Sequence, residues 1–455
     1  MIRIPKVITE VVQNDLCIGC GLCVYKCPEK ALTMNWNEYG FLIPEHTGNC
    51  DTKGECIEVC PFNPKPPKEV ETENELAQLF LGGASNLNEK TGRYNKFYAG
   101  YSKEFRLTSS SGGVTSYILT QLLEKRIVDC IFSIKESETP GVYYEYAISF
   151  TRDELLKASK TRYFPVTLGN VLPKISEIQG KVAIVGVACF IKAIRLAQYK
   201  NPALKEKIPF LAGIICGGLK SRFYTEYLSE KAGAGKQFTN PQYRIKNFDS
   251  TAGDYSFGCY DVETRQKKTI RMKTAGDMWG TGLFKAHACD FCEDVTTELA
   301  DISMGDAWIN PYHQDGRGTN LVVTRSELAE NLVSEGIAKG ELVLEEMDSD
   351  RFILSQKGAY NHKHNGLPFR IKRTQAQNML TPVKRFGNKK VPPDFKVVQF
   401  LRMKIRKKSL EEWRKNPKAE IFDRKMNKYL ILLKLATAVY HYKKLIMRKF
   451  SKMLK

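Results

Sequence analysis

The chain has 455 residues, 42% apolar content and a formal net charge of +20. This is enough for two or three hydrophobic cores at about 150 residues each. The charge is uneven, because residues 384–455 contain 23 Lys and Arg but only 5 Asp and Glu. Thirteen cysteines in tight groups argue against a disulfide framework and for a reducing compartment, so we expect a cytoplasmic protein. We recognise no signal peptide and no apolar run of about 18 residues that would span a bilayer.

Residues 1–66 contain seven clustered cysteines and predict a ferredoxin-type module with two clusters. The run Cys17-x2-Cys20-x2-Cys23-x3-Cys27-Pro28 has bacterial ferredoxin spacing, in which the fourth thiolate reaches the other cluster. A second group follows: Cys50, Cys56 and Cys60-Pro61. Cross-ligation assigns one 4Fe-4S cluster to Cys17, Cys20, Cys23 and Cys60, and the second cluster to Cys27, Cys50 and Cys56. A zinc site is the alternative, but seven cysteines fit it poorly, because a structural zinc ion is coordinated by four ligands.

The second cluster departs from the regular pattern, because Lys53 stands where a cysteine is expected. An ammonium group is a poor iron ligand. We therefore expect either a 3Fe-4S cluster or a 4Fe-4S cluster with Asp51 or water at one iron. Absence of the cluster is the other alternative, and it would leave Cys50 and Cys56 without a role.

Residues 67–96 are predicted to be a linker, with a Pro-rich exit from the module and a short acidic amphipathic stretch at 69–80. Strands and helices then alternate through residues 97–365. Strands are expected at 98–101, 128–134, 143–150, 181–187 and 209–216, and helices from about 114, at 153–158, after 187 and at 221–231. The predicted fold class is α/β, with a mostly parallel sheet that has helices on its faces.

Four further cysteines lie at the ends of the predicted elements. Cys189 follows one strand and Cys216 ends the next, and Cys289 and Cys292 form a Cys-x2-Cys pair. Because ligands collect beyond the carboxyl ends of parallel strands, these four thiols can close another iron–sulfur cluster.

The segments SSSGGVTSYILTQLL, KVAIVGVACFIKAIR, IICGGLKS and CDFCEDVTTELADISMGDAW, behind a two-cluster module, resemble the family of coenzyme F-420 (deazaflavin) hydrogenase/dehydrogenase beta subunits. The variety that it resembles most accompanies bacterial surface-polysaccharide genes. The resemblance implies an FAD- and iron–sulfur-dependent oxidoreductase that passes electrons from a ferredoxin-type donor through clusters to FAD and on to a hydride or electron acceptor. It also matches Cys189, Cys216, Cys289 and Cys292 to cluster ligands. The alternative is a non-catalytic electron-transfer subunit that serves a partner enzyme.

The same resemblance assigns two segments to the flavin: Ser110, Ser111, Gly112 and Gly113, and then Lys160, Thr161 and Arg162. A small-residue turn that opens a helix lets backbone N–H groups approach a pyrophosphate. A serine N-cap is the plain alternative for the first segment, and a solvated loop for the second. Val187-Ala188 replaces the family's Thr-Pro, and Gly217 replaces a His. The resemblance therefore does not lead us to predict deazaflavin as the cofactor of this chain.

Four other residues have simpler expected roles. Asp306 is expected to accept hydrogen bonds from backbone amides in a turn. Cys130 is expected in the core, and Cys259 either in the core or near the site. His287 is a weak proton-donor candidate that is more simply an ordinary surface or hydrogen-bonding histidine.

Residues 366–455 are predicted to be a basic helical tail. Apolar residues at helical spacing, with Lys and Arg between them, fit a helix that rests on an anionic membrane surface; these residues are Tyr429, Leu430, Leu433, Ala436, Val439 and Tyr440. A plain solvated helix is the alternative, and nucleic acid is disfavoured as a partner. We expect peripheral attachment at the inner face of the membrane.

Overall fold

The N-terminal module is a small ferredoxin-like unit in the computed structural model, which describes residues 3–50 and 54–453. Its antiparallel hairpin pairs Leu32 with His46. Left-handed glycines, Gly21 and Gly54, precede its two short α-helices, as expected for a duplicated motif. The elements are η1 (Val7–Val12), α1 (Leu22–Tyr25), β1 (Leu32–Trp36), β2 (Leu42–His46) and α2 (Glu55–Glu58).

The predicted linker folds onto the body of the molecule. Its helix begins after Thr72, whose backbone N–H donates to the Glu75 carboxylate at 2.8 Å in a capping box. The buried Glu73 side chain lies 3.2 Å from Lys192 in α6 (Ala188–Lys200), so this helix is fixed by a buried ion pair. The elements are η2 (Lys68–Val70), α3 (Glu73–Leu81), β3 (Asn86–Asn88) and β4 (Gly92–Tyr94).

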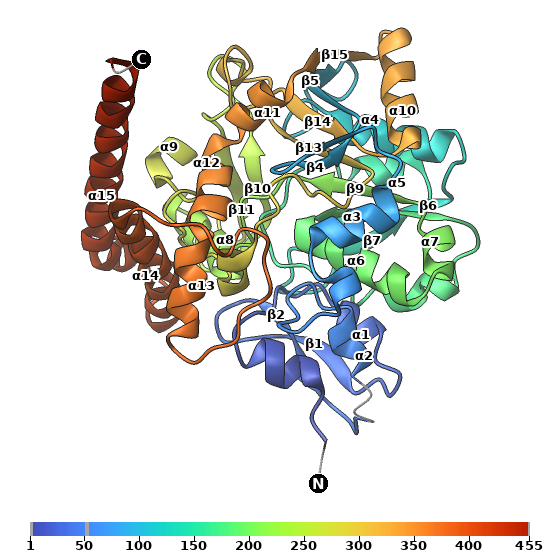
Figure 1. Ribbon diagram of the computed structural model, residues 1–455, viewed down its shortest axis with the longest axis horizontal. Helices are drawn as coiled ribbons and strands as arrows, with labels where there is room; N and C mark the ends of the chain where they lie inside the picture. Colours follow the sequence, from blue (N-terminus) through green and yellow to red (C-terminus); the bar gives the residue numbers. More distant parts are fainter. Residues whose placement is uncertain (1–2, 51–53, 454–455) are drawn as a thin grey trace.

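An eight-stranded mixed sheet forms the centre of the molecule (Figure 1). Its order is β15-β5-β14-β13-β9-β8-β6-β7. The predicted parallel arrangement holds for the four central strands β13, β9, β8 and β6, whereas the remaining pairings are antiparallel. The connection 137–143 between β6 and β7 is too short for a crossover, so these strands form a hairpin. The strands are β5 (Lys96–Ser102), β6 (Cys130–Glu136), β7 (Tyr144–Ser149), β8 (Val182–Val187), β9 (Phe210–Ile214), β13 (Ile302–Asp306), β14 (Asn320–Thr324) and β15 (Leu342–Met347).

Helices cover both faces of this sheet. Side chains of β6 alternate between the two cores, since Ile131 packs with α4 and α10 while Phe132 packs with α6. The core that contains Phe132 also contains the ferredoxin module, so module and body are joined by one apolar interior. The remaining elements of this region are α4 (Val114–Glu124), α5 (Arg152–Leu156), η3 (Leu172–Ser176), α7 (Ala203–Lys207), η4 (His287–Phe291), η5 (Tyr312–Gln314) and α10 (Glu327–Ala338).

A second, three-stranded antiparallel sheet lies between the central sheet and the C-terminal helices, and the sequence patterns did not predict it. Its strands are β10 (Phe238–Ile245), β11 (Ser256–Asp261) and β12 (Lys267–Arg271). The helices α8 (Arg222–Lys231) and α9 (Met272–Ala275) pack beside it.

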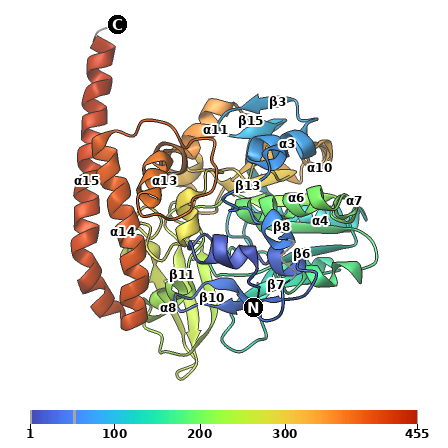
Figure 2. The same ribbon diagram turned by 60° about the horizontal axis from the view of Figure 1, so that its bottom comes forward.

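The basic tail is helical, as predicted, and it packs against the body. The helices α14 (Pro393–Lys415) and α15 (Ala419–Met453) form an antiparallel pair along one side of the molecule (Figure 2). Trp413 is 2% exposed, and its indole N–H donates to Glu226 of α8 at 2.9 Å. The preceding elements are α11 (Ser349–Ser355), α12 (Lys357–Tyr360), η6 (Asn361–Asn365) and α13 (Leu367–Gln375).

Candidate functional site

The structure brings together the four cysteines predicted for the first ferredoxin cluster, here called the first thiol set: Cys17, Cys20, Cys23 and Cys60. Burial raises the pKa of Cys17 to about 12 and that of Cys20 to about 11. Burial and then the neighbouring thiols raise the pKa of Cys23 and Cys60 well above the usual range. Four thiolates so close together need positive charge between them, and the irons of a cubane supply it.

The second thiol set consists of Cys27, Cys50 and Cys56. Burial, followed by Cys27 and Cys50, raises the pKa of Cys56. The backbone N–H of Ala31 donates to the Cys27 sulfur at 3.3 Å, a contact that would stabilise a thiolate. Asp51 and Lys53 lie outside the described residues, so the fourth position of this set stays a prediction.

The third thiol set consists of Cys189, Cys216, Cys289 and Cys292, at the carboxyl ends of β8 and β9 and around η4. Burial, then Cys289, Cys292 and Cys216, raise the pKa of Cys189. The sulfurs receive hydrogen bonds from Gly218 N–H at 3.3 Å, Leu219 N–H at 3.2 Å and the Lys363 ammonium at 3.3 Å. Among the described residues, no three His, Cys, Asp or Glu side chains are arranged to hold a single metal ion.

The three thiol sets follow one another in space. Cys56 of the second set raises the pKa of Cys23 and Cys60 in the first set. Cys20 of the first set in turn raises the pKa of Cys189 in the third. Helix α1 of the first set contacts α2 of the second set and α6 of the third, so the spatial order of the thiol sets is second, first, third.

A glycine allows the first set to approach the body closely. Gly21 has φ +79°, and a Cβ there would lie 2.7 Å from the Gly169 Cα. The Leu168 N–H donates to the Cys20 carbonyl at 3.0 Å, which fixes the module against this loop.

Aromatic side chains connect the third thiol set to a cavity. Trp279 packs on Gly217, next to Cys216, where a Cβ would lie 3.1 Å from the indole. The rings of Trp279 and Tyr163 have centroids 4.7 Å apart, and those of Tyr163 and Tyr243 are 5.6 Å apart. Tyr243 lines the cavity, so a short series of contacts joins it to the thiols.

This cavity has a volume of about 230 Å³ and contains four of the seven predicted flavin residues, here called the basic cavity. The Thr161 N–H donates to the Ser110 hydroxyl at 2.9 Å, which joins the two predicted segments. The lining residues are Leu107, Ser109, Ser110, Lys160, Thr161, Arg162, Gln242, Tyr243, Arg244, Ile245, Lys246 and Phe248.

Positive charge dominates the basic cavity. The Arg162 guanidinium stacks on Tyr144 at 4.5 Å, and its Nε and one terminal nitrogen are buried without a hydrogen-bond partner in the described structure. Burial, then Lys160, Arg244 and Arg106, lower the pKa of Lys246 to about 7. Such unbalanced cations fit the pyrophosphate of a dinucleotide. The residues present therefore fit the pyrophosphate part of FAD.

The other three predicted flavin residues do not line the basic cavity. The Ser111 carbonyl accepts a hydrogen bond from Lys246 at 2.7 Å. A Cβ on Gly112 would lie 2.6 Å from the Gly100 carbonyl, so this glycine serves packing between the loop and the sheet. Gly113, not a serine, precedes α4, and Asn320 accepts from the Val114 N–H at 3.0 Å.

Several cavity residues were missed by sequence reasoning. Arg244 and Lys246 come from β10 and the residue just after it, about 80 residues after the predicted loop, and no local motif marks them. Asp306 forms an ion pair with Arg244 instead of bonding backbone amides as expected. The carboxylate thus orients a cavity cation.

The other candidates are buried away from the basic cavity. Cys130 is fully buried in β6, as predicted, and Cys259 contacts the Ser229 hydroxyl at 3.3 Å in the core between β11 and α8. His287 is buried rather than on the surface, 3.4 Å from Asp15. Burial and Arg406 lower the pKa of His287 to about 3, so the ring is a neutral imidazole near neutral pH and not an imidazolium acid.

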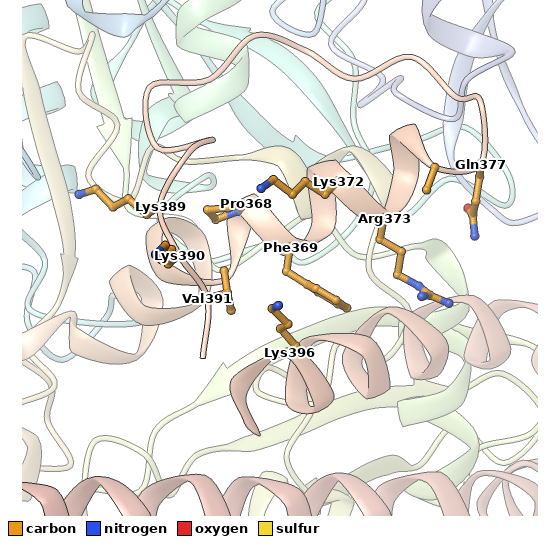
Figure 3. A pocket seen from close by; sticks show the side chains of 10 residues that line it. Pro368, Phe369, Lys372, Arg373, Gln377, Lys389, Lys390, Val391 and Lys396 are labelled. Carbon is orange, nitrogen blue, oxygen red and sulfur yellow. The ribbon is translucent and has the colours of Figure 1, made fainter. Parts of the chain in front are cut away.

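A larger cavity, about 750 Å³, lies at the tail between α13 and α14 (Figure 3). Basic side chains surround Phe369 and Val391 there, namely Lys372, Arg373, Lys389, Lys390 and Lys396. No residue of the three thiol sets lines it. The basic cavity beside Tyr163 is therefore the better flavin candidate.

Models of known protein families match three parts of the chain. The family model for the amino-terminal part of the coenzyme F420 hydrogenase/dehydrogenase beta subunit matches residues 97–173, and the model for its carboxyl-terminal part matches residues 179–350. A 4Fe-4S dicluster domain model matches residues 16–63. The chain belongs to this family of beta subunits. The family binds FAD, so the protein is an FAD- and iron–sulfur-dependent oxidoreductase, as the sequence predicted.

Two relatives and one solved structure show how far the similarity extends. The chain is 25% identical to a component of the F(420)H(2) dehydrogenase of Methanosarcina mazei, over 72% of this chain and 84% of the relative. It is 26% identical to the coenzyme F420-dependent sulfite reductase of Methanocaldococcus jannaschii, over 76% of this chain but only 50% of the relative. A chain of the F420-reducing NiFe hydrogenase complex from Methanosarcina barkeri is 20% identical, with a TM-score of 0.46, over 64% of this chain and 94% of that one.

Proposed function

We propose that this protein passes electrons from a ferredoxin-type donor through its clusters to FAD in the basic cavity, and on to a hydride or electron acceptor. One observation carries the proposal: the three thiol sets and the basic cavity form a single series. Helix α1 with Cys23 contacts both α2 with Cys56 and α6 with Cys189, and Trp279 and Tyr163 continue the series to the cavity. Iron–sulfur clusters exchange single electrons, and a flavin can deliver two as a hydride.

The residues have separate tasks in this proposal. The first and third thiol sets hold 4Fe-4S clusters, and the second set holds a cluster that is 3Fe-4S or has a ligand other than cysteine. Arg162, Lys160 and Lys246 neutralise the phosphates of FAD. Asp306 holds Arg244 in position, and the Tyr163 ring excludes water between the third set and the cavity.

The acceptor is open to two chemistries. The names of the two relatives make a deazaflavin a candidate, supplied as a diffusible substrate. The replacements Val187-Ala188 and Gly217 remove polar groups beside the third set, which favours a different acceptor. A role in surface-polysaccharide metabolism stays a prediction of the sequence resemblance.

Anaerobic purification with iron, sulfide and flavin analysis tests the proposal. We expect bound FAD and more iron than two 4Fe-4S clusters contain. Turnover of a small acceptor by the reduced protein, without a partner, supports the proposal that the chain is itself an enzyme. If turnover appears only in a stable complex, the alternative holds, in which the chain is an electron-transfer subunit of a partner enzyme. Protein with a full complement of iron but no flavin would contradict both the cavity assignment and the mechanism.

A further inference from the structure

The helix α15 is the outermost element on its side of the molecule, and α14 separates part of it from the body (Figures 1 and 2). Its inward face packs tightly, since Met426, Leu433 and Tyr440 are buried and Tyr440 stacks on Phe395 at 4.6 Å. This face includes most of the residues from which the sequence predicted membrane contact. That predicted surface is therefore already covered by protein.

A second apolar face of α15 points into solvent. Its residues recur every three or four positions and so form one stripe along the helix. These residues are Ile431 (49% exposed), Leu435 (59%), Val439 (61%), Tyr442 (68%) and Ile446 (37%), with Leu432 (52%) beside them. An exposed apolar stripe of this length on one helix marks a surface that another apolar phase covers.

The charged residues of this part of α15 are all basic. Residues 424–455 contain ten Lys and Arg and neither Asp nor Glu. At 100° per residue, Lys434 and Lys443 lie on opposite margins of the stripe. Both have exposed side chains, and neither has an ion pair in the described part of the chain.

We propose that the outward face of α15 rests on the surface of an anionic lipid bilayer. The stripe enters the boundary between headgroups and acyl chains, and the flanking lysines contact lipid phosphates. No helix in the described residues could cross a bilayer, so the contact is peripheral.

Other occupants fit less well. A second copy would place an equally basic helix against this one, and like charges would repel. Single-stranded nucleic acid stacks its bases on aromatic rings, but the stripe is mostly aliphatic.

Co-sedimentation of the intact holoprotein with vesicles tests the proposal. We expect binding to vesicles that contain phosphatidylglycerol, weak binding to pure phosphatidylcholine, and a loss of binding as salt rises. The variant Leu435→Gln/Val439→Gln/Tyr442→Gln should bind at least tenfold more weakly. The control Leu79→Gln/Leu87→Gln/Val343→Gln changes exposed apolar residues elsewhere and should bind like wild type.

A second variant separates charge from apolar contact. Lys434→Gln/Lys443→Gln leaves the stripe intact and should weaken binding to phosphatidylglycerol vesicles only. Full binding by both α15 variants, or no binding by wild type, overturns the proposal. So does a wild-type dimer in light scattering that the stripe variant converts to a monomer, because a second copy would then cover this face.

Discussion

Lys363 is expected to raise the reduction potential of the cluster held by the third thiol set, and Lys363→Gln removes that effect. Its ammonium is buried, 3.3 Å from the Cys292 sulfur, and also donates to the Asp294 carbonyl at 2.5 Å. A cation beside a cluster ligand stabilises the reduced, more negative state. The residue lies in η6, beyond the part of the chain that the family model matches.

The magnitude follows from the distance. Two unit charges 3.3 Å apart interact by ~5 kcal/mol at an effective dielectric constant of about 20. The added electron is shared with more distant irons, so we expect about 1.4–2.8 kcal/mol. This free energy corresponds to a tenfold to hundredfold change in the equilibrium constant for reduction, or ~60–120 mV for a one-electron couple.

Potentiometric titration followed by electron paramagnetic resonance measures this shift. The Lys363→Gln potential should fall, while Lys363→Arg should stay near wild type because it keeps the charge. Lys357→Gln, an exposed lysine in the preceding helix, is the matched control. An unchanged or higher potential in Lys363→Gln, with iron content and thermal unfolding preserved, would refute the electrostatic reasoning.

Three further predictions concern stability and flavin binding. Trp413→Ala should lower the free energy of unfolding by about 3–5 kcal/mol in denaturant titrations, because a buried indole is lost; a change below about 1 kcal/mol would mean that the tail is detached. Arg162→Met should weaken FAD binding about tenfold or more, measured as flavin retained on dialysis, whereas full retention would place FAD elsewhere. Lys246 has a pKa of about 7 without ligand, and an anion binds its protonated form. FAD affinity should therefore be constant below pH 7 and fall above it, and Lys246→Arg should abolish this dependence; the same pH dependence in that variant would exclude Lys246.

The thiol sets were predictable because their information is local. The spacing of Cys17, Cys20, Cys23 and Cys27 implies cross-ligation, and strand ends alone placed Cys189 and Cys216 together. The alternation of strands and helices similarly predicted the central parallel strands. The antiparallel edges of the sheet were not predicted, since one depends on the hairpin between β6 and β7 and the other on which strands pair with β5.

The basic cavity and the tail show what local patterns leave out. Arg244 and Lys246 reach the cavity only because β10 belongs to a second sheet. The hydrophobic periodicity of the sequence did not predict that sheet. In α15 both helix faces are apolar, so periodicity could not say which one α14 covers. Leu433 and Leu435 are two residues apart, yet one is buried and the other is 59% exposed.

The most direct test of the electron path is rapid mixing of anaerobic protein with a reduced ferredoxin while the flavin spectrum is followed. Wild type and Cys189→Ser are compared, because Cys189 belongs to the third thiol set and lies beside Cys20 of the first. We expect Cys189→Ser to keep its FAD and its ferredoxin-module clusters, but to reduce the flavin at least tenfold more slowly. Equally fast flavin reduction in both proteins would contradict a path through the third thiol set.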